Sequence, residues 1–480
     1  VYTTPAPLAA LPGSAGGASS TGTGMAGGGA ISIEAGGAVT VDGSITADGD
    51  TYVAGYSTAG SGGGIYIQCD TISGNGLISA AGGGNGDSGT WSKGGGGGRI
   101  AVLYNTTNQP GIQPVPSLMF RVCSALATST GTQVGEPGTL YFPDNYFLAS
   151  PFRYTAQWMV PGFTNWRVAS LAMTNASLWI PANGFALTVS NDLRIVGTNE
   201  YLHQLRMIGG VVRVGGNIQM ATSRVDLMAG QTFGVDLACV SNFTIGPRVR
   251  ATVYSFPTNG LPRYGALLAM GGAFTIATNS TLYLYCNQTN GGGPYIEAGS
   301  MNIAEGGSVN AAGGGYHSTT IEGIGPGGGA AATRGGGGHG GAGGTSSAGR
   351  GITNGIAEAP MNAGSSGAGY GAIPGDAGGG VVRIKVGDTM RVDGSINANG
   401  ASGTANAAGG AGGSIWRTSY IFSGAGSLLA NGGNGTAANG SGGGGGRIAL
   451  WRVRDVAMNV STSVAGGLGD GSGGDGAPGT

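Results

Sequence analysis

Charged residues are scarce in this sequence: Asp, Glu, Lys and Arg make up 9% of its 480 residues, and the formal net charge is −1. A nucleic-acid-binding surface needs clustered Lys and Arg to displace counterions, so the composition argues against nucleic acid as a partner. It argues equally against electrostatic docking on anionic lipid. Because little repulsion keeps copies apart, the composition favours association of the chain with itself.

Long apolar runs are also absent, since no stretch reaches the 18 or so consecutive apolar residues that a membrane-spanning helix needs. We therefore expect no membrane span. The length suits two to four ordinary domains or one long stack of repeats.

Cysteine and histidine are too few to predict a metal centre. The four cysteines, Cys69, Cys123, Cys239 and Cys286, lack the close pairs of a zinc site or a disulfide scaffold. We expect small buried strand residues, with one or two disulfides in an exported protein as the alternative. The three histidines are not spaced as ligands, and His339, surrounded by glycine, is predicted to be an exposed loop residue.

Glycine is what the sequence has in excess: 107 Gly and 19 Pro make up about a quarter of the chain. That level often signals disorder. However, 40% of the residues are apolar and they form short β-branched runs, whereas disordered chains are usually apolar-poor and charge-rich. The sequence therefore predicts a folded, β-rich chain whose loops are mostly glycine.

Alternating apolar and polar residues identify the strands. Ile31 and Ile33, then Val39 and Val41, follow a period of two, which is typical of a strand with one buried face. No stretch has a helical period. Between residues 151 and 292 longer strand-like runs recur, at 177–180, 185–189, 192–196, 211–214, 243–245 and 281–285. Asn-Gly and Gly-Gly steps are predicted to be the turns between strands.

Composition divides the chain into five segments, and the spacing of strands and turns favours a solenoid over a sandwich or barrel. They are an extended N-terminal arm (1–27), a first glycine-rich β module (28–150), a glycine-poorer β region (151–292), a glycine-rich partial repeat (293–377) and a second glycine-rich β module (378–480).

The glycine residues must serve a purpose, because each costs about 0.5–1 kcal/mol of chain entropy relative to alanine. Asp42-Gly43-Ser44 and Asp393-Gly394-Ser395 are predicted to be tight turns with positive φ. The runs 94–98 and 442–446 both precede Arg-Ile-Ala, so they occupy a fixed place in the fold. We expect close backbone approach or extended segments that hydrogen-bond to neighbouring segments.

One motif series occurs twice and differs at its end. In the first copy GEPGT (135–139) continues into Leu-Tyr-Phe-Pro (140–143). In the second copy the sequence ends with GAPGT (476–480). We interpret Val-Tyr-Thr-Thr-Pro, with which the sequence begins, as a replacement for the Leu-Tyr-Phe-Pro strand that the second copy lacks. We therefore predict subunits joined head to tail by strand addition. The residues of this joint are Val1, Tyr2, Thr3, Thr4 and Pro5 as donor, with Ile448, Ala449, Leu450, Pro478, Gly479 and Thr480 as acceptor.

Other motifs predict little chemistry. Asp87, Asp470 and Asp475 lie in Gly-Asp stretches that weakly resemble calcium-binding nonapeptides, but the units are few and lack the apolar position, so we expect no cofactor or metal. Polysaccharide-active β-helices use carboxylates with basic residues, and the candidates are Asp226, Asp236, Arg213 and Arg224. Surface charge is the ordinary explanation of these residues, so we expect no enzyme. Trp158, Trp166 and Trp179 suit either glycan stacking or capping of the core, and capping is favoured.

The strings VTVDGSITADG, RVDGSINANG, SGNGLISAAGGGNG and GGGGGRIA resemble the glycine-rich repeats of large, mostly bacterial, extracellular and cell-surface proteins. The resemblance covers residues 28–104 and 378–451 well, 293–344 in part and 151–292 hardly at all. It implies a β-solenoid in a secreted surface or matrix protein without a defined catalytic site.

Taken together, the sequence predicts an all-β parallel β-helix or β-solenoid with polyglycine-II-like loops. The predicted function is that of a structural subunit of an extracellular filament, whose partners are other copies of itself. Two alternatives stay open: a surface adhesin that binds glycans, and a covalent tandem array in which these residues are one period of a longer chain.

Overall fold

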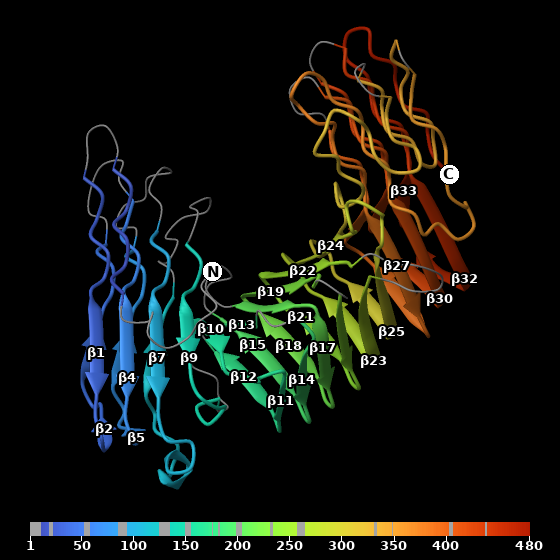
Figure 1. The fold of residues 1–480 in the computed structure, drawn as a ribbon. Coiled ribbons are helices and arrows are strands. Elements are labelled where there is room, and N and C mark those ends of the chain that lie inside the picture. The colour runs from blue at the N-terminus through green and yellow to red at the C-terminus, as the bar shows by residue number, and fades with distance from the viewer. Residues whose placement is uncertain are drawn as a thin grey trace. The chain divides into compact units, whose positions relative to one another are not determined.

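The computed structural model (Figure 1) describes most of the chain. The described residues are 11–18, 23–51, 58–84, 94–123, 135–148, 155–174, 176–180, 183–197, 204–230, 234–256, 265–330, 334–347, 349–402, 407–436 and 439–480.

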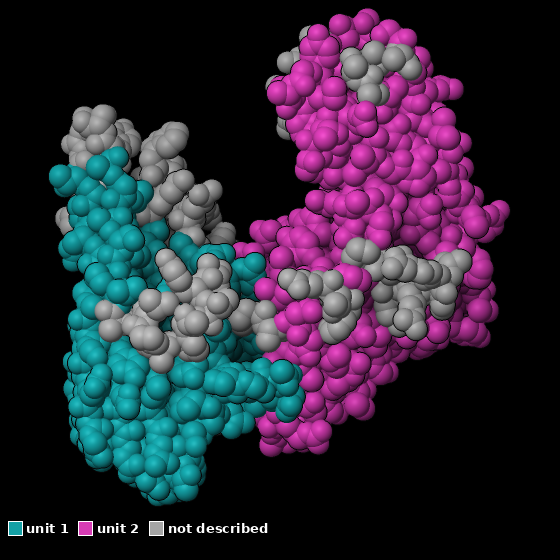
Figure 2. Space-filling view, in the orientation of Figure 1, with its two compact units in different colours: residues 1–166, 171–181, 196–206 teal, residues 167–170, 182–195, 207–480 magenta. Residues whose placement is uncertain are grey.

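The chain forms two compact units, coloured separately in Figure 2. Unit 1 comprises residues 1–166, 171–181 and 196–206, and unit 2 comprises residues 167–170, 182–195 and 207–480. Strands β11 (Asn165–Val168), β15 (Leu193–Val196) and β16 (Gln204–Ile208) contain residues of both.

Unit 1 is built from short strands and one 3₁₀ turn. They are β1 (Ala30–Glu34), β2 (Ala38–Thr40), β3 (Ser44–Thr46), β4 (Gly64–Gln68), β5 (Thr71–Ser73), β6 (Leu77–Ser79), β7 (Arg99–Leu103), η1 (Gln109–Gly111), β8 (Met119–Arg121), β9 (Thr139–Tyr141), β10 (Thr155–Met159), β12 (Leu171–Thr174) and β13 (Ser177–Ile180). The pairing is parallel, with β1, β4, β7 and β9 in one ladder and β3, β6 and β8 in another.

Unit 2 contains the remaining strands. They are β14 (Phe185–Val189), β17 (Gly210–Val214), β18 (Ile218–Ala221), β19 (Ser223–Met228), β20 (Val235–Cys239), β21 (Phe243–Ile245), β22 (Val249–Tyr254), β23 (Ala266–Ile276), β24 (Thr281–Tyr285), β25 (Pro294–Ile303), β26 (Ser308–Asn310), β27 (Val381–Val386), β28 (Thr389–Val392), β29 (Ser395–Asn397), β30 (Ser414–Gly424), β31 (Ser427–Leu429), β32 (Arg447–Met458) and β33 (Ser461–Ser463).

These strands also pair in parallel. One ladder runs β14, β17, β20, β23, β25, β27, β30 and β32, and another runs β19, β22, β24, β26, β29, β31 and β33. Figure 1 shows the first ladder as a row of aligned arrows from β14 to β32. The fold is therefore all-β with long parallel sheets, compatible with a parallel β-helix, and η1 is the only helical turn in the described residues.

We call one pass of the chain along these ladders a rung. In unit 1 the first rung is 30–46 and the second is 64–79, whereas in unit 2 the last rung is 447–463 and the one before it is 414–429. Inward-facing apolar side chains stack from rung to rung and form the core, because alternate strand residues point to the same face. Thus Ile65 pairs in register with Ile100, and both are buried.

Glycine-rich segments between the rungs lie extended and hydrogen-bond to neighbouring segments. The N–H of Gly413 donates to Ala398 (N···O 2.7 Å), and that of Gly443 donates to Gly433 (2.8 Å). A Cβ on Gly413 would lie 2.0 Å from the carbonyl oxygen of Gly380. The prediction of close backbone approach is therefore confirmed at these positions.

Two local predictions were wrong. Gly43 and Gly394 do not have positive φ; a Cβ on Gly394 would instead lie 2.1 Å from the carbonyl oxygen of Gly307, so close approach is the reason for glycine there. His339 is fully buried rather than exposed, because neighbouring glycine segments pack around it.

The cysteines are free thiols, and Cys69, Cys239 and Cys286 are buried as expected, while Cys123 is half-buried. Burial raises the pKa of the Cys286 thiol to about 12. In the part of the chain that the structure describes, no helix is long and apolar enough to cross a membrane.

Candidate assembly interface

The last rung of unit 2 leaves a strand edge open. Strand β32 pairs with β30 and β33 pairs with β31, and neither has a second neighbour among the described residues. An open edge presents unpaired N–H and C=O groups, which makes it a template for another strand. It lies where the sequence predicted the acceptor.

Thr480 already occupies the first position of a further strand on this edge. Its N–H donates to the carbonyl of Gly446 (N···O 3.1 Å), and its own carbonyl accepts from the N–H of Ile448 (2.8 Å). These two bonds are the pattern of a parallel ladder in which Thr480 faces Arg447. In unit 1 the corresponding residue is Thr139, whose N–H donates to Gly98 (3.1 Å).

In unit 1 the strand continues past this point. Strand β9 pairs Leu140 with Ile100 and Tyr141 with Ala101 along β7. Because Arg447-Ile448-Ala449 repeats Arg99-Ile100-Ala101, the uncovered positions on β32 are those that β9 covers on β7.

The exposure of the apolar side chains agrees with an uncovered rung. Ile65, Ile100 and Ile415 are at most 1% exposed, whereas Ile448, which pairs with Ile415, is half-buried. Leu450, two residues further along the same face, is also half-buried. Both side chains lack the neighbour that a following rung provides.

The backbone of β32 offers hydrogen bonds at the same positions. The N–H of Arg447 donates to Gly413 in the preceding rung, while that of Ile448 points to Thr480. Because this direction alternates along a parallel strand, the N–H of Leu450 and the carbonyl of Ile448 face the open side.

The Arg447 side chain holds Thr480 on the last rung by a hydrogen bond. Its Nη1 donates to the Thr480 hydroxyl (2.7 Å), and its Nε and Nη2 donate to the carbonyl of Asn354 (3.0 and 2.9 Å). Burial lowers the pKa of Arg447, and the charge of Glu358 opposes that shift.

Asn354 is held in turn by the buried His339. The imidazole Nδ1 lies 3.0 Å from Asn354 Oδ1, and Nε2 lies 2.9 Å from the Ser414 hydroxyl. Desolvation lowers the pKa of His339 to about 4, although the hydrogen bond to Asn354 opposes this, so the ring is neutral near pH 7. Sequence reasoning missed His339 and Asn354, because nothing in a glycine-rich loop indicates which rung it packs on.

The outer face beside the edge is aromatic and apolar. Trp451 and Val453 are 50% and 68% exposed, and the Trp451 indole N–H donates to the carbonyl of Glu358 (2.8 Å). Trp451 also meets Trp416 edge to face, with centroids 5.8 Å apart.

The structure also shows the positions of the remaining acceptor residues of the predicted joint. Gly479 donates its N–H to Val464 (2.7 Å), and Pro478 is exposed on the same segment. Ala449 is buried between Ile448 and Leu450 on β32. The proposed donor strand, Val1, Tyr2, Thr3, Thr4 and Pro5, lies outside the described residues.

The calcium candidates are not brought together. The Asp475 carboxylate accepts from the N–H of Gly469 (2.7 Å), Asp470 accepts from Gly473 through its backbone carbonyl, and Asp87 lies outside the described residues. Among the described residues no group of three His, Cys, Asp or Glu side chains is placed to hold a metal.

The carboxylate candidates form two separate pairs. Arg224 lies 2.8 Å from the Asp226 carboxylate, on β19, whereas Arg213 of β17 donates to the backbone carbonyl of Asp236. Burial raises the pKa of Asp236, and Arg213 opposes the shift. The two pairs belong to different ladders, so they do not form one site.

Two of the three tryptophans of the middle region are buried, so their rings are not open to a glycan. Trp158 and Trp166 are 3% and 4% exposed, and Trp158 packs on Phe142 with centroids 5.5 Å apart. Trp179 lies beneath the Arg206 guanidinium, 4.2 Å from the ring centroid.

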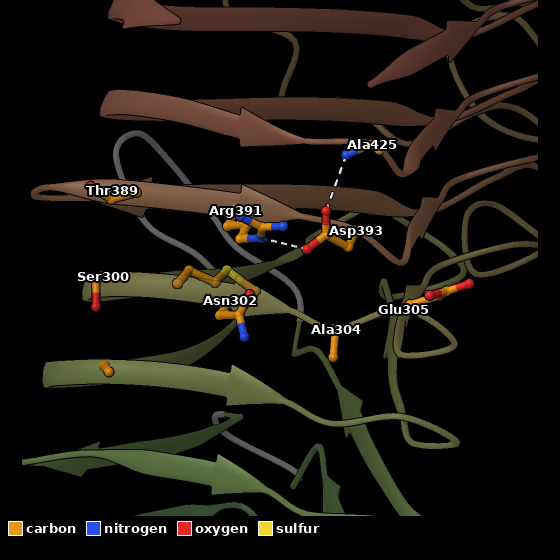
Figure 3. Close-up of a pocket in the computed structure, with 10 residues that line it drawn as sticks. Ser300, Asn302, Ala304, Glu305, Thr389, Arg391, Asp393 and Ala425 are labelled. Carbon is orange, nitrogen blue, oxygen red and sulfur yellow. Dashed lines mark hydrogen bonds and ion pairs between the residues drawn. The ribbon is translucent and has the colours of Figure 1, made fainter. Parts of the chain in front are cut away.

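A groove of mixed polar and apolar lining lies on unit 2 (Figure 3), with a volume of about 730 Å³. Asn302 of β25 and Thr389 and Arg391 of β28 line it. Arg391 Nε lies 2.5 Å from Asp393 Oδ2, and Asp393 Oδ1 accepts from the N–H of Ala425 (3.2 Å). The hydrogen bond from Arg391 holds the pKa of Asp393 below its ordinary value.

A scan against protein-family models and searches of curated proteins and of solved structures found no match to this chain.

Proposed function

We propose that the protein is a structural subunit of an extracellular filament, built as a parallel β-solenoid and assembled head to tail by strand addition. The observation that carries this proposal is Thr480, which lies in ladder register on Arg447 with the next positions of β32 uncovered. Secretion to the cell surface or matrix follows from the resemblance to glycine-rich surface repeats.

The donor is the segment Val1–Pro5 of a second copy. Placed directly after Thr480, Val1 takes the position of Leu140 and Tyr2 that of Tyr141, so Val1 pairs with Ile448 and Tyr2 with Ala449. In this register the N–H of Tyr2 donates to the carbonyl of Ile448, and the N–H of Leu450 donates to Tyr2. Main-chain bonds supply affinity, and burial of Val1 over the core adds an apolar contribution.

Such a joint is heterologous, because one end of a copy meets the other end of the next. Contacts of this kind propagate when rotation does not close a ring. The net charge of −1 leaves little repulsion to oppose the addition of further copies.

Deletion of residues 1–12 tests the proposal. We expect purified wild-type protein to form unbranched filaments in negative-stain electron microscopy, and the deletion variant to stay monomeric with an unchanged thermal unfolding midpoint. Long filaments of the deletion variant would contradict strand donation, and a wild-type protein that stays monomeric at all concentrations would contradict the filament.

A covalent tandem array would place the same strand on β32 from a following repeat. The mass of the denatured native material distinguishes the two versions. Non-covalent subunits give the mass of a single copy of the repeated unit, whereas a covalent array gives a multiple of that mass.

A glycan-binding adhesin is the second candidate, and the groove of Figure 3 favours it. Arg391, Asp393 and Asn302 present donors and acceptors together on one sheet face, which is what sugar hydroxyls require. We expect any glycan-array signal to fall in Arg391→Ala and Asn302→Ala but not in Arg383→Ala, whose guanidinium stacks on Tyr295 away from the groove. Array signals that all three variants retain, or none from wild type, would exclude this site.

A further inference from the structure

An arginine occupies an inward-facing position in the core of unit 2. Arg417 of β30 stands in register between Ile384 of β27 and Leu450 of β32, both of them apolar. Its side chain is fully buried. Moving a charged group out of water is costly unless hydrogen bonds and an opposite charge satisfy it, so the partners of this guanidinium have to be accounted for.

The described residues satisfy the Arg417 guanidinium only in part. Its Nη1 donates to the hydroxyl of Ser419 (2.6 Å), and its Cζ lies 3.3 Å from the centroid of the Phe422 ring. Among the residues that the structure describes, none accepts a hydrogen bond from Nε or Nη2, although both nitrogens are buried. The contact with the Phe422 ring satisfies the face of the guanidinium but not the N–H groups at its edge.

Arg447 shows what this edge of a buried guanidinium binds when a partner is present. It is the other buried arginine of the described residues, and its Nε and Nη2 donate together to the carbonyl oxygen of Asn354 (3.0 and 2.9 Å). Desolvation lowers the pKa of Arg417 to about 9; the charge of Arg452 adds to this effect and that of Asp455 opposes it. Arg417 therefore still carries its charge near pH 7.

Two charged side chains of the next rung lie beside Arg417. On β32, Arg452 pairs in register with Ser419 and Asp455 pairs with Phe422. Arg452 Nε lies 2.5 Å from Asp455 Oδ1, and the two side chains are 34% and 36% exposed. Asp455 is therefore engaged by Arg452, and the two cations with one carboxylate leave one positive charge in excess at this place.

We propose that Arg417 anchors an oxyanion-binding site in unit 2, in which Nε and Nη2 each donate to one oxygen of a carboxylate, sulfate or phosphate group. Two N–H groups on one edge of a planar guanidinium match two oxygens of such a group, and Arg452 supplies a second positive charge. Because Arg417 is covered, the anion reaches it by displacing the partly exposed side chains of Leu450 and Arg452. The inference goes beyond the proposed function and does not depend on it.

Isothermal titration calorimetry with sodium acetate, sodium sulfate and sodium phosphate tests the site, at an ionic strength held constant with sodium chloride. We expect at least one of these oxyanions to saturate one site per chain with a Kd below about 20 mM. Tightest binding of acetate would identify a carboxylate as the ligand, and tightest binding of sulfate or phosphate would identify a tetrahedral group. No saturable binding of any of the three would overturn the inference.

Arg417→Met removes the donors and keeps an unbranched side chain. We expect the affinity for the oxyanion to fall by about tenfold or more, because the two charge-assisted hydrogen bonds are lost. The unfolding midpoint without oxyanion should equal or exceed that of wild type, since an apolar group replaces a buried unpaired charge.

Arg383→Met is the matched control for this variant. Arg383 lies one rung earlier, between the rings of Tyr295 and Trp416, with its Cζ 4.4 and 5.1 Å from their centroids. It should bind the oxyanion like wild type. Wild-type affinity in Arg417→Met, or an equal loss in both variants, would show that Arg417 does not hold the anion.

Asp455→Asn should have the opposite effect to Arg417→Met. It removes the carboxylate beside the site, and the position is partly exposed, so the fold should persist. We expect the affinity for the oxyanion to rise about threefold or more, because the repulsion is lost and Arg452 is released to contact the anion. A variant that merely unfolds cannot show such a gain, and an affinity equal to or below that of wild type would contradict the site.

Discussion

At the scale of single residues, many positions require glycine because the backbone of a neighbouring rung leaves no room for a Cβ. Gly413, Gly446 and their counterparts face a backbone carbonyl at about 2 Å from where a Cβ would stand. The sequence predicted this use from the glycine runs that precede Arg-Ile-Ala. It could not assign φ at Gly43 or Gly394, because Asp-Gly-Ser is equally typical of a positive-φ turn.

Gly413→Ala should destabilise unit 2 by about 2–3 kcal/mol, because the new methyl group overlaps the carbonyl of Gly380 and forces two rungs apart. Urea unfolding measures the change. Gly111→Ala, with open space around its Cβ, should stay within about 0.5 kcal/mol of wild type. Equal effects of the two substitutions would refute the packing argument.

His339 should make unit 2 sensitive to mild acid. Its pKa is about 4 in the folded chain, below the ordinary 6.5, so the unfolded chain binds the proton first as the pH falls. The stability that neutral His339 contributes is therefore complete above about pH 6.5 and is lost progressively toward pH 4, by about 3 kcal/mol in total.

Urea unfolding of wild type and His339→Gln at pH 7, 5.5 and 4 checks this. The difference between the two proteins should shrink as the pH falls, because glutamine does not titrate. A constant difference across this range would mean that His339 does not carry the dependence.

At the scale of elements, the alternating apolar pattern predicted the short strands, but it did not predict the long ones. The runs predicted at 177–180 and 185–189 are β13 and β14. In contrast β23 continues for 11 residues through Gly271 and Gly272, where a register shift between Met270 and Ala273 bends it from one ladder into the next. A Gly-Gly step is typical of both a turn and a bulge, so the pattern alone could not separate them.

The candidate site could be predicted only in part, because a local sequence pattern reveals strands but not contacts between distant residues. The repeat of GEPGT and GAPGT located the edge, because strands recur with the motif. The hydrogen bonds between Arg447 and Asn354 join residues 93 positions apart, and no local sequence pattern predicts them.

Leu450→Pro should prevent assembly while unit 2 stays folded, because proline removes an N–H that points away from β30 and is tolerated at strand edges. Leu450→Val keeps the N–H and should assemble within about threefold of the wild-type concentration. Sedimentation of both variants, alongside their circular dichroism spectra, makes the comparison. Assembly of Leu450→Pro at wild-type concentration would show that this edge is not used.

At the scale of the whole molecule, low charge is part of the proposed mechanism. The joint is made of main-chain bonds and apolar side chains, and the copies carry a net charge of −1. Raising the salt concentration from about 0.05 M to about 0.5 M should change the critical concentration for assembly by less than about twofold, because the joint as proposed contains no ion pair between copies that salt could screen. Light scattering measures this, and a change of tenfold or more would indicate an electrostatic contact instead.

The most direct test of the central claim is a cryo-electron microscopy map of the assembled protein at a resolution that separates strands. We expect continuous parallel strand density across the joint, in which the N-terminal segment of one copy adds to the open edge of β32 of its neighbour. A filament held by side-to-side contacts, with β32 exposed to solvent, would contradict the account.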